Sequence, residues 1–282
     1  MNVQWYPGHM TKAVRQMQED LSLIDLIIEL VDARVPVSGR NPDIDELGKN
    51  KARLIILNKA DLADDRQNEA WTSAFQAKGA YVVQADSRRS ADMKAVRAVL
   101  QEACREKRER DQKRGIRNRP VRAMVAGIPN VGKSTFINTF AGKACTKTGN
   151  KPGVTKGRQW IRLNKDVELL DTPGILWPKF EDQQVGIHLA FIGSVKDEVV
   201  NLEELALLLI AELQSRYPDS IKNRYQISAD AEPLQVLSGI ARVRGCIKKG
   251  EELDYARAAG LLLEDFRSGK LGRITVEWAE EG

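Results

Sequence analysis

The chain has 282 residues, about twice the length of a typical single domain, so we expect two compact units. Hydrophobic residues make up 42% of it and charged residues 29%, a balance that excludes wholesale disorder. Its longest strongly apolar run, Leu205–Ala211, is far shorter than the roughly 18 residues of a membrane span. The first residues lack a basic and an apolar region, so we expect no signal peptide and no membrane contact. The three cysteines lie far apart, which excludes a disulfide framework and a Cys-x-x-Cys zinc site and favours the reducing cytoplasm.

The positive charge is concentrated in one segment. The whole chain carries a formal net charge of +5, whereas residues 105–122 alone contain nine Lys or Arg and three Asp or Glu. A solvated helix end followed by a loop is one interpretation of this segment. A surface that contacts a polyanion is the other, because each phosphate that Lys or Arg neutralises releases condensed counterions.

The first two thirds of the chain alternate short apolar runs with helical stretches. Strands are predicted at Leu26–Val31, Arg53–Leu57, Ala80–Val83, Val121–Ala126, Gln159–Leu163 and Val167–Leu170. Helices are predicted at Met10–Leu21, at Asp64–Lys78 and from Ser90 to about Arg110. This alternation predicts an α/β fold in which a parallel, doubly wound sheet is covered by helices on both faces.

The pattern changes after Pro178. Helical periodicity predicts an amphipathic helix from Leu202 that ends at Tyr217-Pro218, and further helices at Pro233–Ile247 and Glu251–Arg267. We therefore expect one domain over residues 1–178 and a smaller, mostly α-helical domain over residues 179–282. Its candidate nucleic-acid contacts are Arg216, Lys222, Arg224, Arg242, Arg244, Lys248 and Lys249. A solvated helical face is the alternative interpretation of these charges.

A phosphate-binding pattern follows the predicted strand that ends at Ala126. The pattern G-x-x-x-x-G-K-[ST] is matched by Gly127-Ile-Pro-Asn-Val-Gly132-Lys133-Ser134, which opens a predicted helix. Its glycines let backbone N–H groups surround phosphates, and the helix N-terminus adds positive charge. Lys133 can reach the β- and γ-phosphates, and the hydroxyl of Ser134 can bind Mg²⁺.

Two further loops suit the same chemistry. Asp171-Thr-Pro-Gly174 follows a predicted strand, where the carboxylate can hold Mg²⁺ through water and the N–H of Gly174 can face the γ-phosphate. Upstream, Pro152-Gly-Val-Thr155 offers a threonine that can complete the Mg²⁺ coordination when a γ-phosphate is present. Each is an ordinary turn in isolation, and their position downstream of the phosphate loop makes them informative.

The choice of base is predicted by Asn58-Lys-Ala-Asp61, directly after the second strand. The carboxylate of Asp61 can accept hydrogen bonds from N1–H and the 2-amino group of guanine. Adenine offers no such pair of donors, so a buried Asp61 would remain unpaired against it. Asn58 would hold the N7 side, and the stem of Lys59 would pack on the base. The three motifs together predict GTP rather than ATP.

These motifs resemble those of the Ras-like GTPases, but their order is circularly permuted, because the guanine motif comes first. With Trp5-Tyr-Pro-Gly-His-Met10 and Asp32-Ala-Arg-Val-Pro36, the chain resembles the circularly permuted ribosome-assembly GTPases. The resemblance implies a cytoplasmic GTPase, expected to be a monomer, that acts late in assembly of the large (50S) ribosomal subunit and contacts its 23S rRNA.

The resemblance also implies the residues of the site. Those expected to bind GTP or GDP are Asn58, Lys59, Ala60, Asp61, Ala85, Asp86, Ser87, Asn130, Val131, Gly132, Lys133, Ser134, Thr135 and Gly174. Ser134, Thr155 and Asp171 are the expected Mg²⁺ ligands. The fifth guanine-loop motif departs from the usual Ser-Ala-Lys, since its place holds Gln84-Ala85-Asp86-Ser87, with a backbone N–H near Ala85 to meet the guanine O6.

Hydrolysis is assigned to His9, Lys133 and Thr155. The position after Gly174 holds Ile175, which cannot orient water, whereas His9 lies beside a Pro-Gly turn, and a histidine side chain suits the orientation of water at neutral pH. Anchoring of the terminus by its aromatic neighbours is the alternative role for this segment. Asn130 resembles an asparagine of GTPases that bind K⁺ beside the phosphates, and a turn-stabilising role is its alternative.

Two functions of different classes remain open. One is a GTP-hydrolysing assembly factor that docks on rRNA of the large-subunit precursor and is stimulated by that particle. The other is a regulatory GTPase switch that binds a protein partner and has no direct role with RNA. The basic segment at residues 105–122 favours the first.

Overall fold

The computed structural model describes residues 9–42, 44, 48–49, 51–116, 119–146, 159–163, 167–172, 174–176, 180 and 182–279. Among the predicted site residues, Thr155 lies outside this set, and the side chain of His9 is also not described. The described chain forms two compact units, a larger α/β unit and a smaller helical unit.

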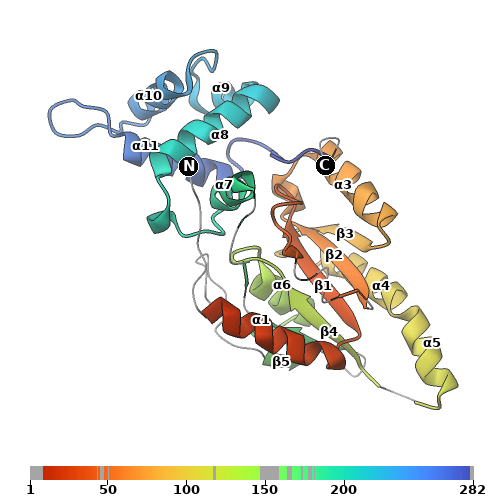
Figure 1. Cartoon of the computed structure of the whole chain (residues 1–282). Coiled ribbons are helices and arrows are strands. Elements are labelled where there is room, and N and C mark those ends of the chain that lie inside the picture. Colours follow the sequence, from red (N-terminus) through yellow and green to blue (C-terminus); the bar gives the residue numbers. More distant parts are fainter. Residues whose placement is uncertain are drawn as a thin grey trace. The chain divides into compact units, whose positions relative to one another are not determined.

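A six-stranded sheet forms the centre of the larger unit, in the order β3-β2-β1-β4-β6-β5 (Figure 1). Its strands are β1 (Leu26–Asp32), β2 (Ala52–Asn58), β3 (Tyr81–Ala85), β4 (Val121–Ala126), β5 (Gln159–Arg162) and β6 (Val167–Asp171). Every residue of β1 is buried, which is why this strand reads as a nearly continuous apolar run in the sequence.

One strand corrects the prediction of a parallel sheet. Neighbouring strands run parallel from β3 through to β6, but β5 pairs with β6 in the antiparallel direction. Only the residues between Arg162 and Val167 connect the two strands. A parallel crossover needs about a dozen residues, so this connection permits only an antiparallel pair.

The helices of the larger unit complete a doubly wound α/β fold. They are α1 (His9–Asp20), α3 (Asp65–Ala77), α4 (Asp92–Ala103), α5 (Arg105–Lys113) and α6 (Lys133–Ala141). Trp71 and Phe75 of α3 pack in one buried cluster with Ile55, Leu57 and Val82 of the sheet. Alternate residues of a strand face opposite sides of a sheet, so Ile55 and Leu57 present one face of β2 to α3.

The single helix predicted from Ser90 to about Arg110 is two helices. It divides at Cys104, which ends α4 with its N–H bonded to the carbonyl of Leu100 and has a ψ of 2°. The reason is burial, since α4 packs Met93, Val96 and Leu100 into the core, whereas α5 buries none of its residues. The two segments therefore lie in different environments and form separate helices.

The smaller unit contains α7 (Gln183–Phe191), α8 (Leu202–Arg216), α9 (Asp219–Tyr225), α10 (Pro233–Val243) and α11 (Tyr255–Arg267). Its core is formed by the buried leucines and isoleucines of α8, α10 and α11. Asp265, which is buried, binds the Nε atom of Arg224 at 2.8 Å and the hydroxyl of Tyr225 at 3.1 Å, so it ties α11 to α9. None of the described helices is long and apolar enough to cross a membrane.

The predicted boundaries of α10 and α11 were wrong by four residues each: α10 ends at Val243 rather than Ile247, and α11 begins at Tyr255 rather than Glu251. Between them the chain forms an antiparallel bridge from Ile247 to Leu253. Gly245 and Gly250 have φ of 61° and 92°, the left-handed region that favours glycine and ends a helix.

The end of the chain differs from the predicted division at 178/179. Glu277 and Ala279 belong to the larger unit rather than the helical one. The carboxylate of Glu277 accepts the N–H of Val37 at 2.6 Å and that of Ser38 at 3.0 Å, and it also contacts the Ser38 hydroxyl. The Nε1 atom of Trp71 donates to the Glu277 carbonyl at 2.8 Å. These bonds fasten the C-terminal segment to α3 and to the loop after β1.

We expect Glu277→Ala to lower the free energy of unfolding by about 1.5–3 kcal/mol, because a carboxylate that accepts several hydrogen bonds is removed. Glu69→Ala, an exposed glutamate on α3, is the matched control and should leave stability nearly unchanged. Urea unfolding of both variants measures the difference. Equal stability of the two variants would show that the C-terminal contact contributes nothing.

Candidate active site

The predicted motifs meet at one edge of the sheet. The phosphate loop follows β4, Asp171 ends β6 and Asn58 ends β2, and the ladder pairs Val125 with Asp171 across β4 and β6. Because parallel strands place their carboxyl ends at the same edge, loops that are far apart in the sequence come together there. This is the position where open α/β sheets bind ligands.

The phosphate loop adopts the conformation that its glycines permit. Gly132 has a φ of 104°, and a Cβ atom there would lie 2.6 Å from Nδ2 of Asn58. Gly174 of the loop after β6 approaches this loop equally closely, since its Cβ would lie 2.8 Å from the Cα of Pro129. Only glycine fits at either position, so the two loops can lie against each other and against Asn58.

Lys133 and Asp171 are buried beside one another at the centre of the site. The Nζ atom of Lys133 donates to the carbonyls of Gly127 at 3.0 Å and Ile128 at 2.9 Å. Burial lowers the pKa of Lys133 to about 8 and raises that of Asp171 to about 6, and the attraction between the two groups opposes both shifts. An anion near Lys133 and a cation near Asp171 would each further stabilise the charged form.

The oxygens around Asp171 suit a divalent cation. Its Oδ1 atom is buried and has no hydrogen-bond partner among the described residues. No group of three or more His, Cys, Asp or Glu within the described ranges is placed to hold a metal. A metal here would therefore rest on one carboxylate, on hydroxyl groups and on ligand oxygens, the donor set that Mg²⁺ prefers beside phosphates. The residues present fit that ion.

Asn58 joins three loops through one buried amide. Its Nδ2 atom donates to the carbonyl of Val131 in the phosphate loop at 2.7 Å. Its Oδ1 atom accepts the N–H of Ser87 at 3.0 Å and the Ser87 hydroxyl at 2.7 Å. The structure thus brings the Asn58–Asp61 motif, the phosphate loop and the segment after β3 into contact.

Lys59 is held by Asp32, a residue that sequence reasoning did not place in the site, and by the predicted residue Asn130. It adopts a φ of 57°, and its Nζ atom lies 3.0 Å from Oδ2 of Asp32 and 3.0 Å from the carbonyl of Asn130. Arg34 forms a bidentate pair with Asp32, with both bonds at 2.9 Å. Although burial favours the neutral acid, these cations hold the pKa of Asp32 well below its usual range. The signal was available, since Asp32-Ala-Arg34 directly follows a buried strand.

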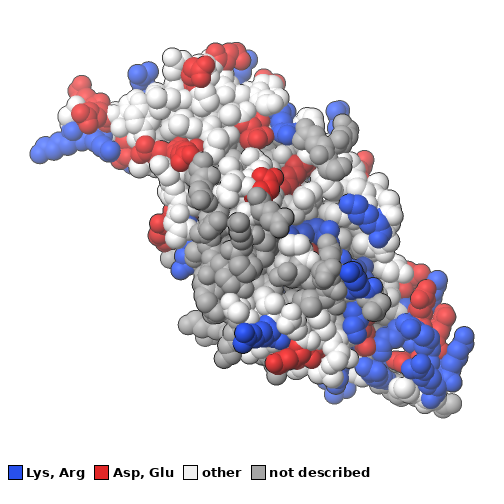
Figure 2. Space-filling view, in the orientation of Figure 1, with Lys and Arg blue, Asp and Glu red and all other residues white. Residues whose placement is uncertain are grey.

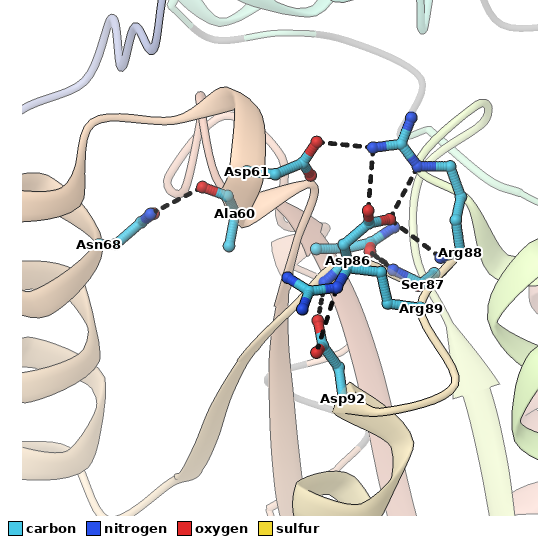
Figure 3. Close-up of polar contacts among 9 residues, drawn as sticks. Ala60, Asp61, Asn68, Asp86, Ser87, Arg88, Arg89 and Asp92 are labelled. Carbon is cyan, nitrogen blue, oxygen red and sulfur yellow. Dashed lines mark hydrogen bonds and ion pairs between the residues drawn. The ribbon is translucent and has the colours of Figure 1, made fainter.

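The loop after β3 faces Asp61 (Figure 3). Ala85 is the last residue of β3 and pairs with Asn58 in the ladder. Asp86 accepts the Nε atom of Arg88 at 2.8 Å, and the Nη2 atom of Arg88 lies 2.6 Å from Oδ2 of Asp61. Arg88 is a further residue that the sequence reasoning missed, and no pattern around it would have identified it.

The remaining predicted residues are placed as follows. Asn130 has a φ of 60°, Val131 is buried in the phosphate loop, Ser134 and Thr135 lie in the first turn of α6, and Ala60 and Asp61 begin a short 3₁₀ helix after β2. Ile175 is buried. His9 begins α1.

Comparison with known proteins assigns the family. Residues 122–236 match the family described as "50S ribosome-binding GTPase". Ribosome biogenesis GTPase A of Bacillus cereus is 47% identical over 100% of this chain and 95% of its own length. The protein of that name from Priestia megaterium is 44% identical over 98% of this chain and 97% of its own length.

Two solved structures agree with this assignment. GDP-bound YlqF has a TM-score of 0.70 and 27% identity over 94% of this chain and 100% of its own. GNP-bound YlqF from T. maritima has a TM-score of 0.67 and 28% identity over 95% of this chain and 99% of its own. The geometry of the site and these relatives lead to one conclusion: the chain is a GTPase and belongs to the ribosome biogenesis GTPase A family.

Proposed function

We propose that this GTPase is an assembly factor in late maturation of the large (50S) ribosomal subunit, where it binds 23S rRNA of the precursor and is stimulated by that particle. The observation that carries the proposal is the presence of a guanine-nucleotide site and an exposed basic helix in one unit. The names of the relatives and of the matching family support the ribosomal role. We place the protein in the cytoplasm and expect a monomer.

Guanine recognition is assigned to the loops after β2 and β3. Asp61 accepts hydrogen bonds from N1–H and the 2-amino group of the base, and Asn58 holds the loops around it. Lys59 packs its stem on the base, because Asp32 and the Asn130 carbonyl fix its ammonium group. Ala60, Ala85, Asp86 and Ser87 complete the surroundings of the base.

Phosphate binding is assigned to the loop after β4. The backbone of Asn130–Gly132 and of Thr135, together with Lys133, surrounds the β- and γ-phosphates, and the N–H of Gly174 faces the γ-phosphate. Ser134, Thr155 and Asp171 hold Mg²⁺, which when bound neutralises charge on the phosphate oxygens. The phosphates stabilise the charged form of Lys133, and the attraction between them grows as negative charge accumulates in the transition state.

RNA binding is assigned first to α5 and the segment that follows it. Lys113 and Arg114 are exposed and have no ion-pair partner among the described residues. Figure 2 shows Lys and Arg gathered over this helix, with fewer acidic residues between them. Lys107 instead pairs with Asp25 at 2.8 Å, so it fixes the helix to the sheet. Phosphates would therefore meet a helix whose position is already fixed.

Three of the seven candidate charges in the helical unit have structural roles. Arg216 pairs with Glu212 at 3.1 Å, Arg224 with Asp265 at 2.8 Å and Arg244 with Asp265 at 3.7 Å. The remaining four, Lys222, Arg242, Lys248 and Lys249, are exposed. We assign a contact with rRNA to these four.

Sedimentation with ribosomal subunits tests the proposal. We expect binding to be stronger with a non-hydrolysable GTP analogue than with GDP, and to weaken steeply as salt rises, because phosphate contacts release counterions. Equal binding with both nucleotides would exclude a switch. Binding that barely depends on salt would instead favour the alternative, a switch with a protein partner.

Asp61→Asn should weaken GTP binding and shift preference toward xanthosine triphosphate. Xanthine offers a carbonyl where guanine has its 2-amino group, so it matches an amide better than a carboxylate. Titration of the wild type and the variant with both nucleotides measures the exchange of preference. Unchanged GTP affinity in the variant would show that Asp61 does not contact the base.

GTP hydrolysis should be faster in K⁺ than in Na⁺ if Asn130 helps hold K⁺ beside the phosphates, where the ion adds positive charge. Asn130→Gly should lose this preference, and because glycine accepts the φ of 60° at this position, the loop can keep its shape. Rates measured in the two salts check both expectations. The same rate in both ions for the wild type would exclude a role for K⁺.

We assign orientation of the attacking water to His9. The neighbouring residue Met10 is buried, and its Sδ atom lies 3.4 Å from the N–H of Leu176, two residues after Gly174. The start of α1 therefore lies beside the loop that faces the γ-phosphate. An imidazole that titrates near neutral pH suits this task.

His9→Ala should keep GTP affinity and lose roughly 10²-fold of the particle-stimulated kcat, as expected for loss of a water-positioning group. Gln18→Ala, an exposed change on the same helix, is the control. Single-turnover hydrolysis with ribosomal subunits measures both variants. A wild-type rate for His9→Ala on the particle would end this assignment.

A further inference from the structure

The guanidinium of Arg88 already occupies part of the carboxylate that we assign to guanine. Its Nη2 atom lies 2.6 Å from Oδ2 of Asp61 (Figure 3). The same guanidinium is anchored to Asp86, through Nε to Oδ1 at 2.8 Å and through Nη2 to Oδ2 at 2.9 Å. The N–H of Asp86 is in turn bound by Asp92 at 2.8 Å, which fixes the anchor to the start of α4.

The two oxygens of Asp61 are in different situations. Oδ2 is bound to Arg88, whereas Oδ1 is buried and has no hydrogen-bond partner among the described residues. A buried acceptor without a donor is unfavourable. The carboxylate therefore has one buried oxygen that lacks a donor and one that a ligand must take from Arg88 or share with it.

The N1–H and 2-amino groups of guanine form the same kind of donor edge as a guanidinium, with two N–H bonds directed to one carboxylate. We propose that Arg88 is an affinity- and specificity-determining residue that competes with the guanine base for Oδ2 of Asp61. This inference rests on the proposed role of Asp61 as the residue that contacts guanine.

Arg88 is suited to displacement. Its side chain is 65% exposed, and exposed ion pairs change an equilibrium by only about two- to five-fold. When the base takes Oδ2, the guanidinium keeps both bonds to Asp86 and so stays within reach. As the nucleotide leaves, Arg88 re-forms its pair with Asp61. The competition therefore raises the dissociation rate of GDP more than it lowers the association rate.

The number of donors on the base separates this role from a general charge effect. Inosine lacks the 2-amino group and makes a single bond, for which the unpaired Oδ1 atom suffices once the base reaches it. Guanine needs both oxygens, so only guanine must displace Arg88. Removal of the guanidinium should therefore favour guanine over inosine.

The test measures affinities and dissociation rates of GDP, IDP and ADP for the wild type, Arg88→Ala and Arg88→Lys. We expect both variants to raise the preference for GDP over IDP by about two- to five-fold, with slower GDP release, because neither retains the planar fork. Arg88→Lys keeps the positive charge. Arg89→Ala is the matched control, since Arg89 is equally exposed at 65% and lies 3.9 Å from Asp92, and it should leave the preference unchanged.

Each other outcome has a distinct meaning. Weaker binding of GDP and IDP alike in the Arg88 variants would overturn the proposal and identify Arg88 as a residue that supports the loop. A gain that is equal for GDP and IDP would overturn it in favour of a general charge effect. A wild type that does not prefer GDP to ADP would remove the role of Asp61 itself. Thermal unfolding of each variant shows whether the fold is retained.

Discussion

The nucleotide site depends on one buried amide. In this permuted chain the guanine motif precedes the phosphate loop by about seventy residues, and the Nδ2 atom of Asn58 connects them with a bond of 2.7 Å to the Val131 carbonyl. The other end of the same amide holds Ser87 after β3. Because Asn58 is 2% exposed, loss of its side chain would leave its partners unpaired in two other loops at once. The loops proposed to bind the base and the phosphates are therefore held together by one side chain, whatever the order of the motifs.

Because the order of the motifs is permuted, the loop after β6 leads along the chain into the helical unit. The loop after β6, with Asp171 and Gly174, is followed along the chain directly by the first residues of that unit, and Gly174 lies against the phosphate loop. At its other end the chain returns to the α/β unit, where Glu277 is bound by the loop after β1. That loop also contains Arg34, which supports Lys59 through Asp32. Along the chain, the helical unit is thus preceded by the loop that contains Gly174 and followed by Glu277, which is bound by the loop after β1.

Much of the fold could be predicted because its signals are local. The strand Leu26–Asp32 is buried throughout and reads as an apolar run, and the phosphate loop needs glycines at fixed spacing. The direction of β5, the division at Cys104 and the support of Lys59 by Asp32 were not predicted. The support of Lys59 by Asp32 depends on residues far apart in the sequence, and the division at Cys104 depends on which of two adjoining segments is buried. The direction of β5 depends on the short connection from Arg162 to Val167. Arg88 was not predicted either, because its partner Asp61 lies in the loop after β2, whereas Arg88 lies in the loop after β3.

Asp32 and Asp171 are equally buried carboxylates whose surroundings shift their pKa values in opposite directions. Asp32 and Asp171 are 0% and 1% exposed, and burial alone would raise the pKa of both. Asp32 has Arg34 and Lys59 within 3.0 Å, which hold its pKa well below the usual range. Asp171 has only the attraction of Lys133 and one amide bond against burial, so its pKa rises to about 6, and its Oδ1 atom has no partner among the described residues. The first carboxylate is satisfied by the protein and positions Lys59. The second keeps a buried oxygen without a partner among the described residues, which supports the proposal that Asp171 helps to hold Mg²⁺.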